Sequence, residues 1–277
     1  IKSFIKTWQI ILERHAILRT SFHWENLEEP LQTTHKKVPL PLDVLDWSEI
    51  SPREQLAKLR IFQREDREQG FNLTKPALFR ITAIQMSRSR WQIINTHHHI
   101  ILDGWSGGIL NTEITEIRQS LQQGRVLSLE KTYPFSNYIR WIEKQDADKV
   151  EQFWRQKLSG IVEPTPLPGD KGLTNSPPQN QVKSWAIQLP ATTYTALENT
   201  ALDCNVTLNI LLLAAWSLIL SYYSGEKSVL FGLLVSGRPP SLKGVDGIVG
   251  MFLNTLPFRV EVEASLPLNE WLQKILN

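Results

Sequence analysis

Residues 97–106 read His-His-His-Ile-Ile-Leu-Asp-Gly-Trp-Ser, and this stretch decides how the rest of the chain is interpreted. Three of the chain's six histidines occur here side by side. An apolar run rich in β-branched residues precedes them, and a helical pattern follows Ser106. We therefore expect a strand to end at the histidines, with a turn at Asp103-Gly104. Such a turn exposes side chains beside the unpaired N–H groups that begin a helix.

Side chains alternate between the two faces of a strand. His97 and His99 would then share one face, and His98 would lie on the other. One face could hold a catalytic imidazole while the other buries a histidine that supports the turn. Two alternatives stay open. The first is a metal site formed by His97, His99 and Asp103, which is disfavoured because alternation removes His98 and no cysteine lies nearby. The second is a purely structural cluster of imidazoles.

The remaining chain is a mixture of helices and strands. Ser51, Pro52 and Gly70 bracket one helix with a cap, a first-turn proline and a terminating glycine. Apolar residues at helical spacing predict further helices at residues 5–18, 106–124, 135–158, 191–203 and 207–223 and from 267 onward, besides the one at 52–69. Strands are expected at 20–24, 78–86, 91–100, 183–189, 229–236 and 251–262, with an extended segment at 40–44.

Prolines and glycines crowd into residues 164–178. Such a composition is typical of a linker or a long crossing loop. We therefore expect an N-terminal lobe at residues 1–163 that carries the histidines, a linker at 164–182, and a second lobe at 183–277.

Composition excludes several classes of protein. The chain has 277 residues, 42% of them hydrophobic, and a formal net charge of +2. Nucleic-acid binding is therefore disfavoured, because it normally needs a basic excess or stripe. The single cysteine, Cys204, excludes a disulfide framework and suits a cytoplasmic protein. No signal peptide is evident. The apolar run 208–223 is shorter than the roughly 20 residues of a membrane span, so a buried core helix is expected and no membrane partner.

The histidine stretch also resembles a known family. Residues 98–106 are similar to the His-His-x-x-x-Asp-Gly-Trp-Ser core motif of condensation domains of nonribosomal peptide synthetases. Its shorter His-x-x-x-Asp-Gly part is shared with chloramphenicol acetyltransferase. Further stretches resemble the family's other motifs in the family's order, at residues 14–22, 133–141, 231–239 and 249–259. Ala16 departs from the first of these motifs, which usually carries an acid there.

The resemblance implies a chloramphenicol acetyltransferase-like α/β sandwich in each of two lobes, which meet in a V. The family's first and last motifs are absent, so the chain resembles a fragment truncated at both ends, with the second lobe incomplete. The implied reaction is a step of secondary-metabolite biosynthesis. The amine of an acceptor aminoacyl thioester attacks a donor acyl thioester, and an amide forms.

The resemblance also implies roles for single residues. His99 would be the catalytic base or would position the amine, while His98 and Asp103 would support the site. Asp103 would pair with an arginine, for which Arg19 and Arg238 are the candidates, and Arg19 is the one we place in the site. Gly104 would offer its N–H to the oxyanion or would only be needed for the turn. Trp105, Ser106 and Asn254 would line the tunnel between the lobes.

No cofactor or metal is expected on the domain itself, because the family's substrates arrive on the phosphopantetheine of donor and acceptor carrier proteins. A neighbouring adenylation domain is a further expected partner. Two other functions remain open: a standalone acyltransferase that makes an ester or amide, and a catalytically inactive fragment that docks carrier proteins.

Overall fold

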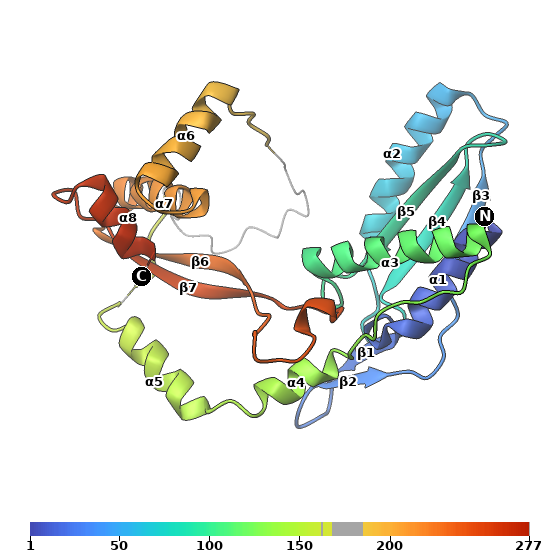
Figure 1. Ribbon diagram of the computed structural model, residues 1–277, viewed down its shortest axis with the longest axis horizontal. Coiled ribbons are helices and arrows are strands. Elements are labelled where there is room, and N and C mark those ends of the chain that lie inside the picture. The colour runs from blue at the N-terminus through green and yellow to red at the C-terminus, as the bar shows by residue number, and fades with distance from the viewer. Residues whose placement is uncertain (162, 168–184, 277) are drawn as a thin grey trace. The chain divides into compact units, whose positions relative to one another are not determined.

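The structure is a computed structural model that describes residues 1–161, 163–167 and 185–276. The chain divides into two compact units, each of which joins separate stretches of sequence (Figure 1). The first unit comprises Ile1–Gln145 and Ser236–Asn254, and the second Asp146–Val235 and Thr255–Asn277. The predicted linker lies largely outside the described residues, so the predicted lobe boundaries stay a prediction.

The first unit contains two small sheets. Strands β1 (Thr20–His23) and β2 (Leu31–Thr34) form an antiparallel pair. In the other sheet, β4 (Phe79–Gln85) lies between β3 (Leu42–Asp46), to which it is parallel, and β5 (Trp91–His97), to which it is antiparallel. The helical elements of this unit are α1 (Lys2–Arg14), η1 (Ala16–Arg19), α2 (Pro52–Gln69), α3 (Gly104–Gln123), α4 (Ser136–Ile142) and η2 (Val245–Gly247).

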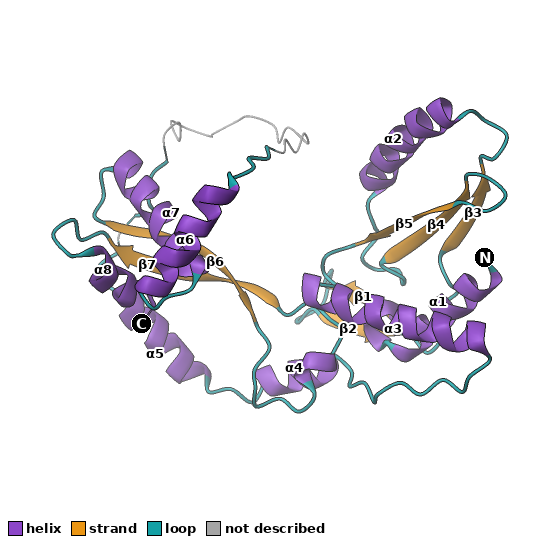
Figure 2. Ribbon diagram, turned by 45° about the horizontal axis from the view of Figure 1, so that its top comes forward, coloured by secondary structure: helices purple, strands orange, loops and turns teal. Residues whose placement is uncertain are grey.

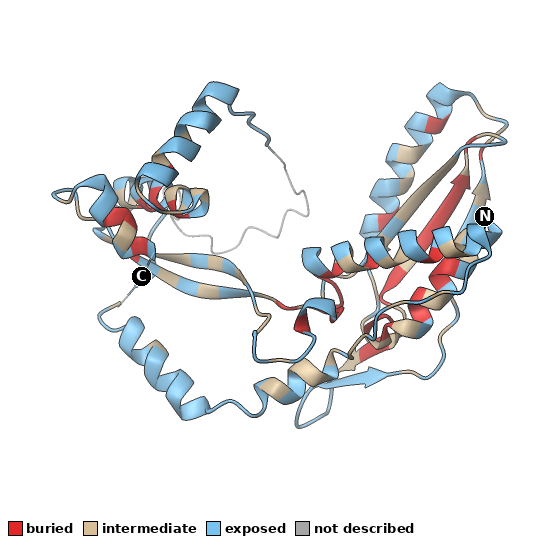
Figure 3. Cartoon of the chain, in the orientation of Figure 1, coloured by how far each residue is buried: buried red, intermediate tan, exposed pale blue. Residues whose placement is uncertain are grey.

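Helices cover both faces of the sheet around β4 (Figure 2). On one face, Phe79 and Ile81 belong to the main apolar core with α1 and α3. On the other face, Ile84 packs with Trp47 and with Phe62 of α2. Figure 3 shows the resulting concentration of buried residues along β4, α1 and the inner side of α3. This packing fixes the end of β5 and the beginning of α3, where the histidine stretch lies.

The predicted helix at 52–69 is confirmed as α2. Ser51 accepts the backbone N–H of Glu54, and the Glu54 carboxylate accepts the Ser51 N–H, which forms a capping box. The helix ends at Gly70, whose φ is +60°. Two buried polar residues attach α2 to the sheet. Gln55 donates to the carbonyls of Trp47 and Met86, and Asp66 accepts from strand residues.

In the described residues of the second unit, four helices pack with most of a pair of strands. They are α5 (Ala147–Lys157), α6 (Ala191–Asp203), α7 (Leu208–Ser224), α8 (Leu268–Leu276), β6 (Ser228–Ser236) and β7 (Leu253–Glu261). Ile210, Val229, Val260, Trp271 and Leu272 are central to its core.

Several sequence predictions are wrong in detail. Residues 185–189 form no strand, and the rest of the predicted strand 183–189 lies outside the described residues. The helix predicted at 135–158 is two helices, because Asp146 accepts the Lys149 N–H at 3.1 Å and so begins α5 anew. Strand β2 has no counterpart among the predicted elements.

Helix α7 is not the buried helix that its composition predicts. Ile210, Ala214, Ser217 and Leu220 are buried along one side. Leu212, Trp216 and Ile219 are exposed. Their spacing places them on a second stripe of the helix. The sequence is apolar on nearly every side of this helix, so it does not show which stripe the second unit buries.

In the part of the chain that the structure describes, no single helix is long and apolar enough to cross a membrane. Helices α6 and α7 reach that threshold only when taken together, and the pair is bent by 102°.

Candidate active site

The histidine run continues β5 into a turn. The last ladder pair of β5 joins Phe79 to His97, so regular alternation of side chains ends there. The His98 N–H still donates to the Leu78 carbonyl at 2.9 Å. The Ile101 N–H then donates to the His98 carbonyl at 3.3 Å and closes a turn over residues 98–101. The prediction that His97 and His99 share one strand face is therefore wrong, because His99 lies in the turn and not in the strand.

Hydrogen bonds and a contact with an aromatic ring hold His98 in place. Its Nδ1 accepts the Ile100 N–H at 3.1 Å, in addition to the two backbone bonds of the turn. Its ring is perpendicular to that of Phe71, with an interplanar angle of 87° and centroids 6.3 Å apart. His98 is therefore both hydrogen-bonded and packed within the turn.

His99 is exposed. Within the described residues its imidazole has no hydrogen-bond partner, so either ring nitrogen is available to a substrate. The charge of His99 also affects the pKa of His97. The pKa of His97 is lowered below its ordinary value, first by loss of solvation and then by the charges of His99 and His98. This shift occurs although His97 itself keeps exposed surface.

Asp103 begins α3 and is buried. Its Oδ1 accepts the Ser106 N–H at 2.8 Å, as a helix cap does, and its Oδ2 accepts the Phe252 N–H at 3.0 Å. Burial alone would raise the pKa of Asp103. The hydrogen bonds from Ser106 and Phe252 and the charge of Arg238 outweigh it, so this pKa is lowered.

Arg238 is the arginine that pairs with Asp103, at 3.6 Å between Nη2 and Oδ1. Its side chain is 5% exposed, and its guanidinium lies 3.9 Å from the centroid of the Phe252 ring. It also donates to the carbonyls of Val245 and Ile248 and to the Ser106 hydroxyl. Its buried Nε has no hydrogen-bond partner among the described residues.

The Arg19–Asp103 pair is therefore a wrong prediction. Arg19 lies at the end of η1, and its guanidinium donates instead to the carbonyls of Leu12, Glu13, His35 and Lys36. Two of these acceptors are in the last turn of α1, where carbonyls lack helical partners and attract a cation.

Gly104 is the first residue of α3. A Cβ built on it would meet nothing within 4 Å, and its φ is not positive. The turn therefore does not need a glycine for its geometry. Because glycine has no side chain, the space beside the first residue of α3 stays open. This observation favours the oxyanion role over the turn role.

The three residues predicted to line a tunnel lie in different environments. Trp105 is 56% exposed, and its Nε1 donates to the Asp246 carbonyl. Asn254 is exposed near the start of β7. Ser106 is fully buried, donates to the Gly250 carbonyl and accepts the Gly250 N–H. Both hydrogen-bonding functions of the Ser106 hydroxyl are thus used within the first unit, and its place in a tunnel stays a prediction.

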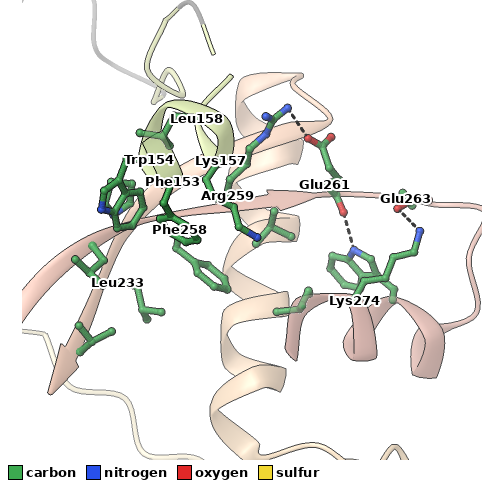
Figure 4. A pocket seen from close by; sticks show the side chains of 16 residues that line it. Phe153, Trp154, Lys157, Leu158, Leu233, Phe258, Arg259, Glu261, Glu263 and Lys274 are labelled. Carbon is green, nitrogen blue, oxygen red and sulfur yellow. Dashed lines mark hydrogen bonds and ion pairs between the residues drawn. The ribbon is translucent and has the colours of Figure 1, made fainter. Parts of the chain in front are cut away.

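Two cavities of the first unit lie close to the histidine stretch and to Trp105. A pocket of about 540 Å³ beside Trp105 extends along α3 toward Glu113, and a smaller one of about 370 Å³ lies between α2 and β5 and ends at His97. A third pocket, of about 420 Å³, belongs to the second unit. Figure 4 shows Phe153, Trp154 and Phe258 within it and charged side chains of Arg259, Glu261 and Lys274 along its edge. It holds no predicted site residue, so we attach no chemistry to it.

The described residues contain no group of three or more His, Cys, Asp or Glu side chains arranged to hold a metal ion. The site is instead an exposed imidazole beside a helix N-terminus. The start of that helix is held by the buried Asp103 and by Arg238 from a distant segment. An exposed imidazole at this place can accept a proton, and the unpaired N–H groups at the start of a helix can stabilise a developing negative charge.

The chain belongs to the Condensation domain family, which matches residues 1–276. It is 36% identical over 284 residues to one of the linear gramicidin synthase proteins of Brevibacillus parabrevis, covering 99% of this chain and 4% of that protein. It is 34% identical over 272 residues to tyrocidine synthase 2 of the same organism, covering 98% and 8%. The chain thus spans a small fraction of the curated relatives it matches.

Solved structures show the same fold. The X-domain from teicoplanin biosynthesis superposes with a TM-score of 0.82 at 22% identity, over 99% of this chain and 61% of the other. The first condensation domain of the calcium-dependent antibiotic synthetase gives 0.74 at 17% identity, over 99% and 64%. The predicted chloramphenicol acetyltransferase-like α/β class is confirmed by these likenesses.

The sequence left one contact of the site undecided and gave no indication of another. Arg238 was only one of two candidates, and no spacing rule could select it, because it lies in the loop between β6 and β7. The Phe71 contact with His98 carried no sequence signal at all.

Proposed function

We propose that this chain forms an amide bond between a donor acyl thioester and the amine of an acceptor aminoacyl thioester. Both substrates arrive on the phosphopantetheine of carrier proteins, in a synthetase that also contains an adenylation domain. The domain itself holds no cofactor or metal in this proposal. The family and its peptide-synthetase relatives support the reaction class. The cytoplasmic location predicted from the sequence stays a prediction.

The single observation that carries the proposal is the position of His99. Its imidazole is exposed in a turn, has no described hydrogen-bond partner, and is separated by four residues from the open N-terminus of α3. An amine aligned by this ring needs little further activation, because a free α-amine has a pKa of about 8 and a thioester is already reactive. Alignment alone contributes strongly to such bimolecular reactions.

In the proposed step, the amine nitrogen attacks the thioester carbonyl carbon, and the N–C bond forms. The carbonyl oxygen gains negative charge, which the Gly104 N–H at the positive end of α3 stabilises. The amine proton passes to His99 as the tetrahedral species forms. The C–S bond then breaks, and the carrier thiolate takes up that proton. Substrates, amide and thiol balance, and His99 returns to its starting state.

The test is a single-turnover condensation assay with loaded donor and acceptor carriers, in the longest natural protein that carries this sequence. We compare the parent with His99→Ala and with the matched control His97→Ala. We expect His99→Ala to lower the rate by about 10²-fold or more and His97→Ala to change it less than about threefold. Equal rates for parent and His99→Ala overturn the catalytic role of His99.

The same assay separates the alternatives. Product from a soluble acyl thioester, with no requirement for carriers, would identify a standalone acyltransferase. Carrier binding without product from any variant would identify a docking module without catalysis.

A further inference from the structure

The ring of Phe71 contacts both a cation and His98 of the active-site turn. The guanidinium carbon of Arg80 lies 4.4 Å from the Phe71 centroid. The His98 ring meets Phe71 at 87°, with centroids 6.3 Å apart. A guanidinium placed over an aromatic ring is attracted to it. Phe71 therefore connects Arg80 with the imidazole of His98.

Arg80 is itself immobilised by the end of α2. Its Nη1 donates to the Gly70 carbonyl at 2.8 Å, and its Nε and Nη2 donate to the carboxylate and the carbonyl of Asp66. The Asp66 carboxylate, buried in this structure, also accepts the Thr96 hydroxyl. Thr96 faces Arg80 across the β4–β5 ladder. Hydrogen bonds of Asp66 and Arg80 thus connect the end of α2 with β4 and with Thr96 of β5, two residues before His98.

The orientation of His98 controls the turn that carries His99. Because Nδ1 accepts the Ile100 N–H, the neutral ring carries its proton on Nε2. This bond spans two residues, as Asn and Asp side chains do when they stabilise turns. His99 is the residue between its two ends. A rotation of the His98 ring would break this bond and leave only the backbone bonds to hold the turn around His99.

We propose that Phe71 and Arg80 are positioning residues: they hold the His98 ring in the rotamer and tautomer that place His99 for reaction. This inference rests on the proposed function for its kinetic consequence. The contact array itself can be tested without any reaction. Neither residue touches substrate in this scheme, and both act through His98.

The first experiment measures the His98 tautomer in the 277-residue chain by long-range ¹H–¹⁵N spectra of ¹⁵N-labelled histidine. The parent should show Nε2–H at His98. Phe71→Leu keeps apolar volume but removes the ring, so we expect a mixture of tautomers. Phe71→Tyr keeps the ring edge and should restore the parent spectrum. Lys58→Gln is the matched control, because Lys58 stacks on Trp47 at 4.7 Å near the other end of α2.

The second experiment measures condensation in the longest natural protein that carries the sequence. We expect Phe71→Leu to lower kcat by about tenfold or more with KM for both carriers within about twofold, since displacement of a catalytic group by about 1 Å can cost 10²-fold. Arg80→Lys keeps the charge but loses the planar stack, and we expect an intermediate loss. Phe71→Tyr should recover kcat, and Lys58→Gln should match the parent.

An unchanged tautomer and unchanged kcat in Phe71→Leu overturn the proposal. If Phe71→Leu does not fold, Phe71→Met replaces it. If neither variant folds, the proposal is also overturned, because Phe71 is then needed for the fold itself. If the parent makes no amide, the proposed function fails, while the spectra still decide whether Phe71 positions His98.

Discussion

The carboxylate of Asp103 accepts the backbone N–H of Phe252 at 3.0 Å, although 149 positions of sequence separate the two residues. The same carboxylate begins α3 and pairs with Arg238. Ser106, one helical turn later, bonds both backbone groups of Gly250. Segment 236–254 is thus attached to the helix that follows the histidine turn. These bonds explain why it belongs to the first unit although its neighbours on both sides in sequence belong to the second.

The Asp103–Arg238 pair should be energetically coupled. We expect Asp103→Asn or Arg238→Met alone to lower the free energy of unfolding by about 3 kcal/mol, because each leaves a buried charge without its partner. The double variant should lose less than the sum, with a coupling of about 1–3 kcal/mol. Urea unfolding of the four proteins measures this coupling.

The exposed pair Arg155–Glu151 on α5 is the control, and its coupling should be about 0.5 kcal/mol or less. Additive losses at Asp103 and Arg238 would show that the two residues stabilise the fold independently.

Gly104→Ala separates the oxyanion role from the turn role. Because the added Cβ meets nothing within 4 Å and φ is not positive, stability should rise by about 0.4–1 kcal/mol. Condensation should fall by about tenfold or more, since the methyl group would occupy the space before the first N–H of α3.

Thermal unfolding and single-turnover rates are the two measurements. Gly107→Ala on the same helix also meets nothing within 4 Å and serves as the control for helix propensity. A destabilised Gly104→Ala chain would instead assign the glycine to the geometry of the turn.

Acid should destabilise the first unit through Asp103 and Glu113. At Glu113, burial would raise the pKa. Hydrogen bonds and charge from His15 and Arg14 outweigh burial, and the pKa is lowered. A carboxyl whose pKa is lower in the folded state binds more protons when unfolded, so its contribution is present above the unfolded pKa of about 4 and is lost as pH falls through the folded value.

We therefore expect the free energy of unfolding to fall as pH drops below about 4. The Asp103→Asn, Glu113→Gln double variant should show a flatter profile over the same range. Urea titrations at a series of pH values measure both curves. Parallel curves for parent and variant would assign the acid sensitivity to other carboxyls.

Much of the local structure could be predicted because it depends on short-range chemistry. The capping residue Ser51 and the terminating Gly70 directly flank the helix they define, so α2 was predictable to within a residue. The strand before the histidines was predictable too, but not its end. Whether a strand continues depends on the partner strand, and the ladder of β4 and β5 stops at His97.

The sequence by itself determined helix α2, the strand before the histidines and the family, because these depend on residues adjacent along the chain. Only the tertiary structure decided which arginine neutralises Asp103, that Ser106 is buried, and that Phe71 supports His98. The physical reason is that a buried charge or hydroxyl must find its partner in space. For Asp103, the partner is Arg238 in the loop between β6 and β7, whereas Arg19 donates to backbone carbonyls elsewhere.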